Sequence, residues 1–127
     1  MPKILIVDDD PLIRNLLGQI LEPFEEKGVA LLMADNGLVA IESVKKENPE
    51  LVFLDVMMPK MNGFEVCSIL KNDLKIKDVY IIILSAKGQE IDKHKAKETG
   101  ADFYITKPFN INELINKVSD VLRIPLS

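Results

Sequence analysis

The chain has 127 residues, of which 47% are hydrophobic and 28% charged, a size and composition that suit one soluble domain with a single core. Its net charge of −4 disfavours a general nucleic-acid binder, because such a protein needs a basic face to neutralise phosphates. No apolar run approaches the ~20 residues that span a bilayer, and the N-terminal stretch MPKILIV lacks signal-peptide features. The single cysteine, Cys67, excludes an internal disulfide. We therefore expect a cytoplasmic protein that binds no membrane.

Five short apolar runs, rich in β-branched and aromatic residues, predict five strands. In chain order they cover residues 3–7, 29–34, 51–54, 80–84 and 102–105. Four of them are almost continuously apolar, which is typical of strands that are buried on both faces of a sheet.

Segments with helical spacing of apolar residues lie between and after these strands. In the first, Asp10 is placed to cap the helix and Pro11 to occupy its first position, while Pro23 is expected to end or kink it. The second predicted helix starts near Gly37 and ends before Pro49, and the third opens after Asn62-Gly63. The fourth covers about 88–99 and is weakly amphipathic, and the last follows a cap at Asn110.

The resulting order is βαβαβαβαβα, and crossover helices join strands that run parallel. We therefore predict an α/β fold in which a five-stranded parallel sheet is covered by helices on both faces (a doubly wound sheet), with residues 1–127 forming one domain. In such folds the functional crevice lies at the carboxyl ends of the strands.

Polar side chains follow four of the predicted strands at that edge. Asp8 and Asp9 follow the first strand, Asp55 the third, Ser85 the fourth and Lys107 the fifth. We expect three carboxylates, one hydroxyl and one ammonium group to converge there, although they are far apart along the chain.

The run Asp8-Asp9-Asp10 places like charges close together, which costs free energy unless the groups point apart into water or share a cation. Only one of the three can be the helix cap, and Asp10 fits that position best. Mg²⁺ prefers oxygen ligands and is held by one or two carboxylates, so Asp8, Asp9 and Asp55 are a candidate magnesium site.

Asp55 has a second potential role, because a carboxylate can attack a phosphoryl group and form an aspartyl phosphate. Phosphoryl transfer depends on positioning and on neutralising the charge of the phosphoryl oxygens. A bound Mg²⁺, the ammonium group of Lys107, the hydroxyl of Ser85 and backbone amides after Asp55 would provide that neutralisation.

The segments ILIVDDD, LVFLDVMMPKMNG, IIILSAKG and GADFYITKPF, followed by an amphipathic helix, resemble the receiver domains of bacterial two-component response regulators over essentially the whole chain. The resemblance implies a flavodoxin-like sheet with strand order 2-1-3-4-5. It also implies that Asp55 is the phosphoacceptor, that Asp9 binds Mg²⁺ directly and Asp8 mainly through water, and that Lys107 and Ser85 contact the phosphoryl group.

Further roles follow from the same resemblance. The backbone carbonyl of Met57 would bind the metal, Ser85 and Tyr104 would form the conformational switch, the Lys107-Pro108 bond would be cis, and Asn62 would cap its helix. The implied protein is a regulatory domain that catalyses only its own phosphorylation and dephosphorylation. Its implied partners are a sensor histidine kinase or phosphotransfer protein and a downstream protein or output domain, without direct nucleic-acid binding, and phosphorylation would favour a dimer through the fourth helix, fifth strand and last helix.

Three alternatives remain open on the sequence. DDDPL partly resembles the start of haloacid-dehalogenase-type phosphatases, with Asp8 as nucleophile and Asp10 as acid, although Leu12 breaks that pattern. A flavodoxin-like cofactor binder would need a phosphate loop where the aspartates stand, and they would repel a flavin phosphate. A receiver-like scaffold that is never phosphorylated would not need the acidic pocket and Lys107.

Overall fold

A computed structural model describes residues 1–86 and 91–126, and it contains one parallel sheet. The sheet has five strands in the order β2-β1-β3-β4-β5, as the family resemblance implied. All five predicted strands are confirmed, the first with the predicted bounds and the other four with small shifts of their ends: β1 Lys3–Val7, β2 Ala30–Ala34, β3 Leu51–Asp55, β4 Tyr80–Ala86 and β5 Phe103–Lys107.

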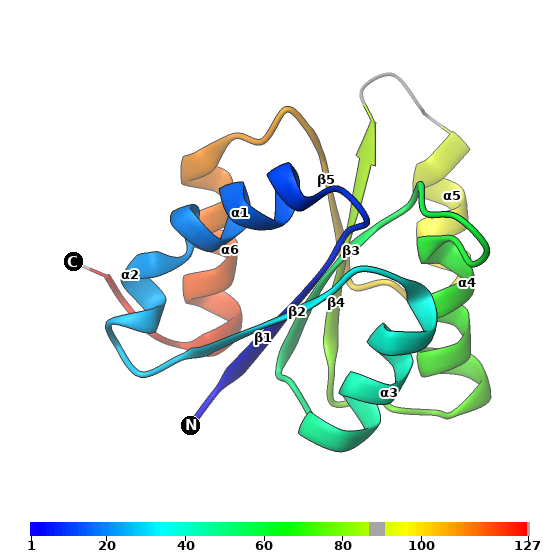
Figure 1. Cartoon of the computed structure of the whole chain (residues 1–127), viewed down its shortest axis with the longest axis horizontal. Helices are drawn as coiled ribbons and strands as arrows, with labels where there is room; N and C mark the ends of the chain where they lie inside the picture. The colour runs from blue at the N-terminus through cyan, green and yellow to red at the C-terminus, as the bar shows by residue number, and fades with distance from the viewer. Residues whose placement is uncertain (87–90, 127) are drawn as a thin grey trace.

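Helices cover both faces of the sheet, which makes the fold doubly wound (Figure 1). One face packs against α1, α2 and α6, through a core that includes Leu17, Phe24 and Leu114. The other face packs against α3 and α4, through a core that includes Ile41 and Phe64. The helices are α1 Pro11–Ile20, α2 Glu22–Glu25, α3 Gly37–Glu47, α4 Gly63–Ser68, the π-helix η1 Ile69–Asp73, α5 Ile91–Glu98 and α6 Ile111–Leu122.

Side-chain alternation along the central strands explains the two cores. On β1, Ile4 and Ile6 face the core beneath α1 and α6, whereas Leu5 and Val7 face the core beneath α3 and α4. All four are fully buried, so these residues stabilise both layers at once. The near-continuous apolar character of the strand sequences is thereby accounted for.

Four helices begin at the polar cap residues that the sequence indicated or allows. The side chains of Asp10, Asn36, Asn62 and Asn110 each accept a hydrogen bond from a backbone N–H in the first turn of the helix that follows. Because those first N–H groups have no partner within the helix, each cap satisfies a donor that would otherwise need water. None of the described helices is both long and apolar enough to cross a membrane.

Two helical segments differ from the prediction. Pro23 neither ends nor kinks α1: the helix stops at Ile20, and Pro23 lies in the first turn of the separate short helix α2, where a proline costs no hydrogen bond. The third predicted helix divides into α4 and the π-helix η1, in which the N–H of Leu74 donates to the carbonyl of Ile69, five residues earlier. The fourth predicted helix is α5, which begins at Ile91, and residues 88–90 of that prediction lie outside the described residues.

The π-helix brings a partly buried lysine to the end of the sheet opposite the carboxyl ends. Lys71 donates from Nζ to the carbonyl of Val79, and the same atom lies 3.1 Å from Oδ2 of Asp102. Asp102 in turn accepts a hydrogen bond from the backbone of Ile81 at 2.8 Å. These contacts fasten the turn before β5 to η1 and β4.

Candidate functional site

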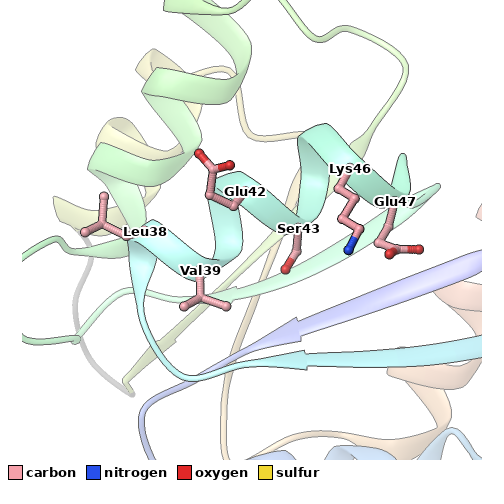
Figure 2. Close-up of a pocket in the computed structure, with 6 residues that line it drawn as sticks. All are labelled: Leu38, Val39, Glu42, Ser43, Lys46 and Glu47. Atoms are coloured by element: carbon pink, nitrogen blue, oxygen red, sulfur yellow. The ribbon is translucent and has the colours of Figure 1, made fainter.

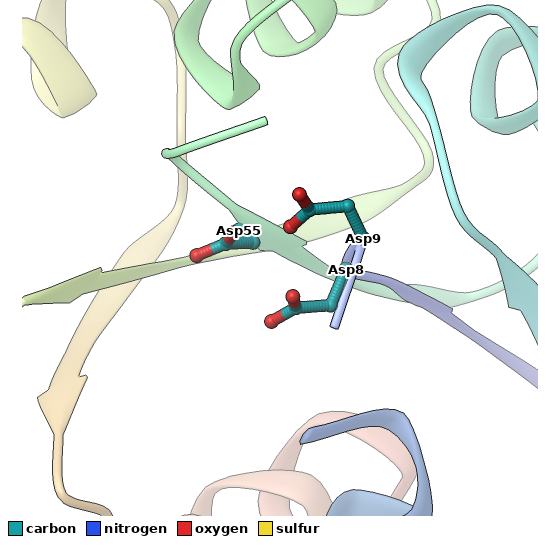
Figure 3. A group of neighbouring side chains, drawn as sticks. All are labelled: Asp8, Asp9 and Asp55. Atoms are coloured by element: carbon teal, nitrogen blue, oxygen red, sulfur yellow. The ribbon is translucent and has the colours of Figure 1, made fainter. Parts of the chain in front are cut away.

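Three carboxyl groups gather at the carboxyl ends of β1 and β3. Asp8, Asp9 and Asp55 each contribute an oxygen, and these oxygens all lie within 4.8 Å of one another. Figure 3 shows the three side chains reaching from β1 and β3 toward the same region. Asp8 and Asp55 are buried, with 1% and 5% of their surface exposed, while Asp9 is exposed. The convergence predicted from the strand ends is confirmed for these three groups.

Lys107 places its ammonium group between the two buried carboxylates. Its Nζ lies 2.9 Å from Oδ1 of Asp55 and 3.3 Å from Oδ2 of Asp8. The lysine comes from the last position of β5 and is followed by the cis Lys107-Pro108 peptide bond that the resemblance implied. The ammonium group of Lys107 therefore bridges Asp8 and Asp55, which are 47 positions apart in the sequence.

Local hydrogen bonds separate the roles of the three consecutive aspartates. Oδ1 of Asp8 accepts a hydrogen bond from the backbone N–H of Asp10, and Oδ1 of Asp10 accepts one from Leu12, both at 2.9 Å. Asp10 is thus the cap of α1, as predicted, and Asp8 faces the site. Arg14 donates from Nη1 to the carbonyl of Asp8 at 2.7 Å, a contact that holds the end of β1 and that the sequence did not reveal.

The strand end that carries Asp55 is packed against the start of α4. The N–H of Gly63 donates to the carbonyl of Val56 at 3.0 Å, and the N–H of Val56 donates to Leu84 at 3.1 Å. A Cβ atom on Gly63 would lie only 2.2 Å from the carbonyl oxygen of Asp55. Position 63 therefore requires glycine, because the start of α4 approaches the backbone at the end of β3 too closely for a side chain.

Burial has the largest effect on the pKa values of the two buried carboxyl groups in this cluster. Desolvation raises the pKa of Asp8, against the lowering effects of the Asp10 amide and Lys107. Desolvation likewise raises the pKa of Asp55, where Lys107 opposes the change and the charge of Asp8 reinforces it. Burial alone would lower the pKa of Lys107, but its bonds to Asp55 and Asp8 outweigh that effect and raise it. A single lysine thus leaves the carboxylates incompletely compensated.

The donor set fits a hard divalent cation. Carboxylate oxygens are the ligands that Mg²⁺ prefers, and here three of them converge around a site with unbalanced negative charge. Asp8, Asp9 and Asp55 are the residues that would hold such an ion.

The other predicted site residues are placed on the surrounding elements. Ser85 is buried and follows Leu84, the residue that pairs with Asp55 across β3 and β4. Tyr104 is half-buried, pairs with Ile83 across β4 and β5, and packs against the core beneath α3 and α4. The side chain of Met57 is 68% exposed beyond the end of β3. These positions agree with the predicted locations, and the roles assigned to the three residues remain predictions.

We expect Asp9→Ala to weaken Mg²⁺ binding at least about tenfold, and Asp10→Asn to change it less than about twofold, because Asp10 faces α1 and Asn caps equally well. Titration of the two variants with Mg²⁺, followed by calorimetry, measures the difference. Equal affinities in the two variants would contradict the separation between metal ligand and helix cap.

Acidification is expected to weaken Mg²⁺ binding at a higher pH than for ordinary carboxylates, because the raised pKa values of Asp8 and Asp55 let protons compete with the metal. For the metal-free protein, a raised native pKa contributes stability that is fully present below the ordinary value and is lost as the pH rises through the raised value. Mg²⁺ affinity and metal-free urea unfolding, each measured between about pH 4 and pH 7, check the two directions. An affinity that is constant over this range would contradict the prediction.

Comparison with known proteins places this chain in a family. The family model described as the response regulator receiver domain matches residues 4–119. The DNA-binding dual master transcriptional regulator RpaA of Synechocystis is 39% identical over 97% of this chain and 50% of its own length. Protein PilG of Pseudomonas aeruginosa is 32% identical over 91% of this chain and 84% of its own length. The chain spans about half the length of most of the curated relatives it matches.

Solved structures give the same result. A putative response regulator from Chloroflexus aurantiacus matches with a TM-score of 0.86 at 30% identity, covering 97% of this chain and 99% of its own. The chemotaxis protein CheY4 of Vibrio cholerae matches with a TM-score of 0.82 at 29% identity, covering 95% of this chain and 98% of its own. These matches favour neither a haloacid-dehalogenase-type phosphatase nor a flavin-binding protein. The chain belongs to the receiver domains of two-component response regulators.

Proposed function

We propose that Asp55 accepts a phosphoryl group and that Mg²⁺ bound at the three aspartates supports the reaction. The observation that carries this proposal is the position of Lys107, whose ammonium group bridges Asp55 and Asp8 at the buried end of the sheet. A lysine held there by two carboxylates is well placed to bind a phosphoryl oxygen near Asp55. Lys107 is the last residue of the edge strand β5, and its side chain reaches the carboxylates at the ends of β1 and β3.

In the proposed reaction, a carboxylate oxygen of Asp55 attacks the phosphorus of a phosphohistidine. The new O–P bond forms while the N–P bond to the imidazole breaks, and the imidazole leaves with the electron pair. Lys107 neutralises part of the charge on the transferred group. A bound Mg²⁺ would supply further charge neutralisation at the phosphoryl oxygens.

Asp55 is a better nucleophile candidate than Asp8, the residue that the phosphatase alternative requires. Asp8 uses Oδ1 to accept from the Asp10 amide and Oδ2 to contact Lys107. Asp55 contacts Lys107 through Oδ1, and within residues 1–86 and 91–126 no hydrogen bond engages its second oxygen. The second oxygen of Asp55 is therefore available for attack.

The partners follow from this chemistry and from the relatives. A sensor histidine kinase or a phosphotransfer protein would supply the phosphoryl group in the cytoplasm. Several relatives are named as transcriptional regulators, and this chain matches about half of each, so an output domain or a separate protein would receive the signal. We assign no direct nucleic-acid contact to this acidic domain, and we place the phosphorylation-dependent dimer contact on α5, β5 and α6.

Incubation with acetyl phosphate and Mg²⁺, followed by intact-mass measurement, tests the proposal directly. The protein should gain one phosphoryl group, and chelation of the metal should prevent the gain. Absence of any phosphoryl addition from acetyl phosphate and from a phosphorylated histidine kinase would favour the non-phosphorylated scaffold instead.

We expect Ser85→Ala to accept phosphate at Asp55 but to lose most of the structural response. The variant removes the buried hydroxyl that would bind the phosphoryl group, while the nucleophile and the carboxylates remain. A phosphoryl group can shift the conformational equilibrium only by interacting more favourably with one state than with the other. Without the Ser85 hydroxyl this difference is smaller, so Tyr104 and its surroundings should move less. Hydrogen exchange of residues 91–106 with and without beryllofluoride measures the response. If the variant binds beryllofluoride and shows the parent's full protection change, the proposed coupling between Ser85 and Tyr104 is wrong.

A further inference from the structure

Two helices of this domain begin with the dipeptide Asn-Gly. Asn36-Gly37 opens α3 and Asn62-Gly63 opens α4, and each asparagine is the cap of its helix. Asn-Gly is chemically labile, because glycine has no side chain to keep its amide nitrogen away from the side-chain carbonyl carbon of the preceding asparagine. The two sites share this sequence but differ in the structure around them.

Asn62-Gly63 is held by contacts on every side. Oδ1 of Asn62 accepts from the N–H of Glu65 at 2.9 Å, and the carboxylate of Glu65 accepts from the N–H of Asn62 at 3.1 Å. The N–H of Gly63 donates to the carbonyl of Val56. Phe64 is buried in the first turn that follows, so opening this turn would expose core side chains to water.

Asn36-Gly37 is held by fewer hydrogen bonds, although Gly37 is buried beside Met61 and Val66. Its cap is a single bond, from the N–H of Val39 to Oδ1 of Asn36 at 3.0 Å, and within the described part of the chain the N–H of Gly37 has no acceptor. Leu38 and Val39 are 67% and 43% exposed. Figure 2 shows them on the first turn of α3, where they line an open pocket with Glu42, Ser43, Lys46 and Glu47.

Opening of the first turn is required at either site. Both asparagines have an extended backbone, with ψ of 168° at Asn36 and 169° at Asn62, and ring closure requires rotation about that bond. At Asn36 the rotation breaks the bond from Val39 and moves the carbonyl that accepts from Ala40. At Asn62 it breaks the reciprocal bonds to Glu65 and the bond from Gly63 to Val56. The free energy of local opening is therefore lower at Asn36.

We propose that Asn36 is a site of spontaneous deamidation in the folded domain and that Asn62 is protected. Water or hydroxide removes the proton from the Gly37 amide, and the nitrogen attacks Cγ of Asn36. The new N–C bond forms, the Cγ–Nδ2 bond breaks, and Nδ2 leaves as ammonia. Water then opens the cyclic imide at either carbonyl and yields aspartate or isoaspartate. The net change consumes one water and releases one ammonia.

The products alter the loop between β2 and α3. Nδ2 of Asn36 now donates to Oδ1 of Asp35 at 2.8 Å, and deamidation replaces that donor by a second carboxylate. The aspartate product can still cap α3, whereas isoaspartate inserts an additional backbone carbon and misplaces the capping oxygen relative to Val39. The isoaspartate form should therefore have a frayed start of α3, at the edge of the sheet that also carries the acidic site.

Peptide mass spectrometry of the whole chain, after incubation at mildly alkaline pH and physiological temperature, tests the proposal. In the folded protein we expect Asn36 to deamidate at least about tenfold faster than Asn62, and in urea the two rates should converge because only the dipeptide sequence then matters. Asn36→Ser, which keeps a capping side chain, should remove the dominant acidic species. Glu65→Ala should raise the rate at Asn62 and leave the rate at Asn36 unchanged.

Three results would overturn the proposal. One is a rate at Asn62 that equals or exceeds the rate at Asn36 in the folded chain. Another is a rate at Asn36 no higher than that at Asn116, which precedes Lys117 in α6. The third is an undiminished difference between Asn36 and Asn62 in urea, because the cause would then not be the folded structure.

Discussion

Replacement of Asp55 by Asn should leave a folded domain that no longer gains a phosphoryl group from acetyl phosphate and Mg²⁺. The amide has nearly the shape of the carboxylate but is a poor nucleophile, so the chemistry is lost while the packing is retained. Removal of this buried negative charge also removes its desolvation cost and its repulsion with Asp8, both of which raise the pKa of Asp55. The metal-free variant should therefore be at least as resistant to urea as the parent at neutral pH.

Asp10→Asn is the matched control for this substitution. It makes the same chemical change at the same edge of the sheet, but Asp10 serves as the cap of α1 and Asn caps equally well. Intact-mass time courses of both variants should show normal phosphorylation for Asp10→Asn and none for Asp55→Asn. Equal labelling of Asp55→Asn and the parent would refute the assignment, and loss of labelling in Asp8→Asn alone would favour the phosphatase alternative.

Replacement of Gly63 by Ala should destabilise the domain by about 3 kcal/mol or more, because the new methyl group meets backbone atoms that cannot move aside. The added Cβ would lie 2.2 Å from the carbonyl oxygen of Asp55 and 3.1 Å from Cα of Val56. Relief requires the start of α4 or the end of β3 to shift. The same substitution should therefore also slow phosphorylation of Asp55.

Gly18→Ala, in contrast to Gly63→Ala, is expected to stabilise the domain. Gly18 lies inside α1, and the nearest atom to its added Cβ is Cε of Met33 at 3.5 Å, an ordinary contact. Alanine is favoured over glycine within a helix, so this variant should gain about 0.5–1 kcal/mol. Urea unfolding of both variants measures the two changes. A Gly63→Ala variant as stable as the parent would show that α4 can move away from the phosphoacceptor strand at little cost.

Those parts of the molecule that depend on local sequence could be predicted. The alternation of strands and helices follows from apolar periodicity, and the caps at Asp10, Asn62 and Asn110 follow from residues whose side chains bond the nearest free N–H groups. The convergence of Asp8, Asp9, Asp55 and Lys107 follows from one rule of topology, that parallel strands end at the same edge. The strand order itself came from the family resemblance.

Features that depend on partners distant in the sequence could not be predicted. In the sequence, Arg14 is indistinguishable from the other polar residues of an amphipathic helix. Its hydrogen bond to the Asp8 carbonyl depends on how α1 packs on the sheet. The requirement for glycine at position 63 depends on the approach of the backbone at Asp55. In the π-helix, Lys71 contacts Val79 and Asp102, which lie just before β4 and β5, and the local sequence does not reveal these contacts.

The contacts of Lys71 have a consequence for the turn that follows α5. Asp102 is bound to Lys71, and Sγ of Cys67 donates to the carbonyl of Thr99 at 3.5 Å, so the turn that follows α5 is fastened on both sides of Gly100. Gly100 has a φ of 88°, which lets the chain reverse sharply there. Helix α5 is thus tied at its C-terminal end to α4 and η1. Lys71 therefore links the turn after α5 to the end of the sheet that lies opposite the acidic site.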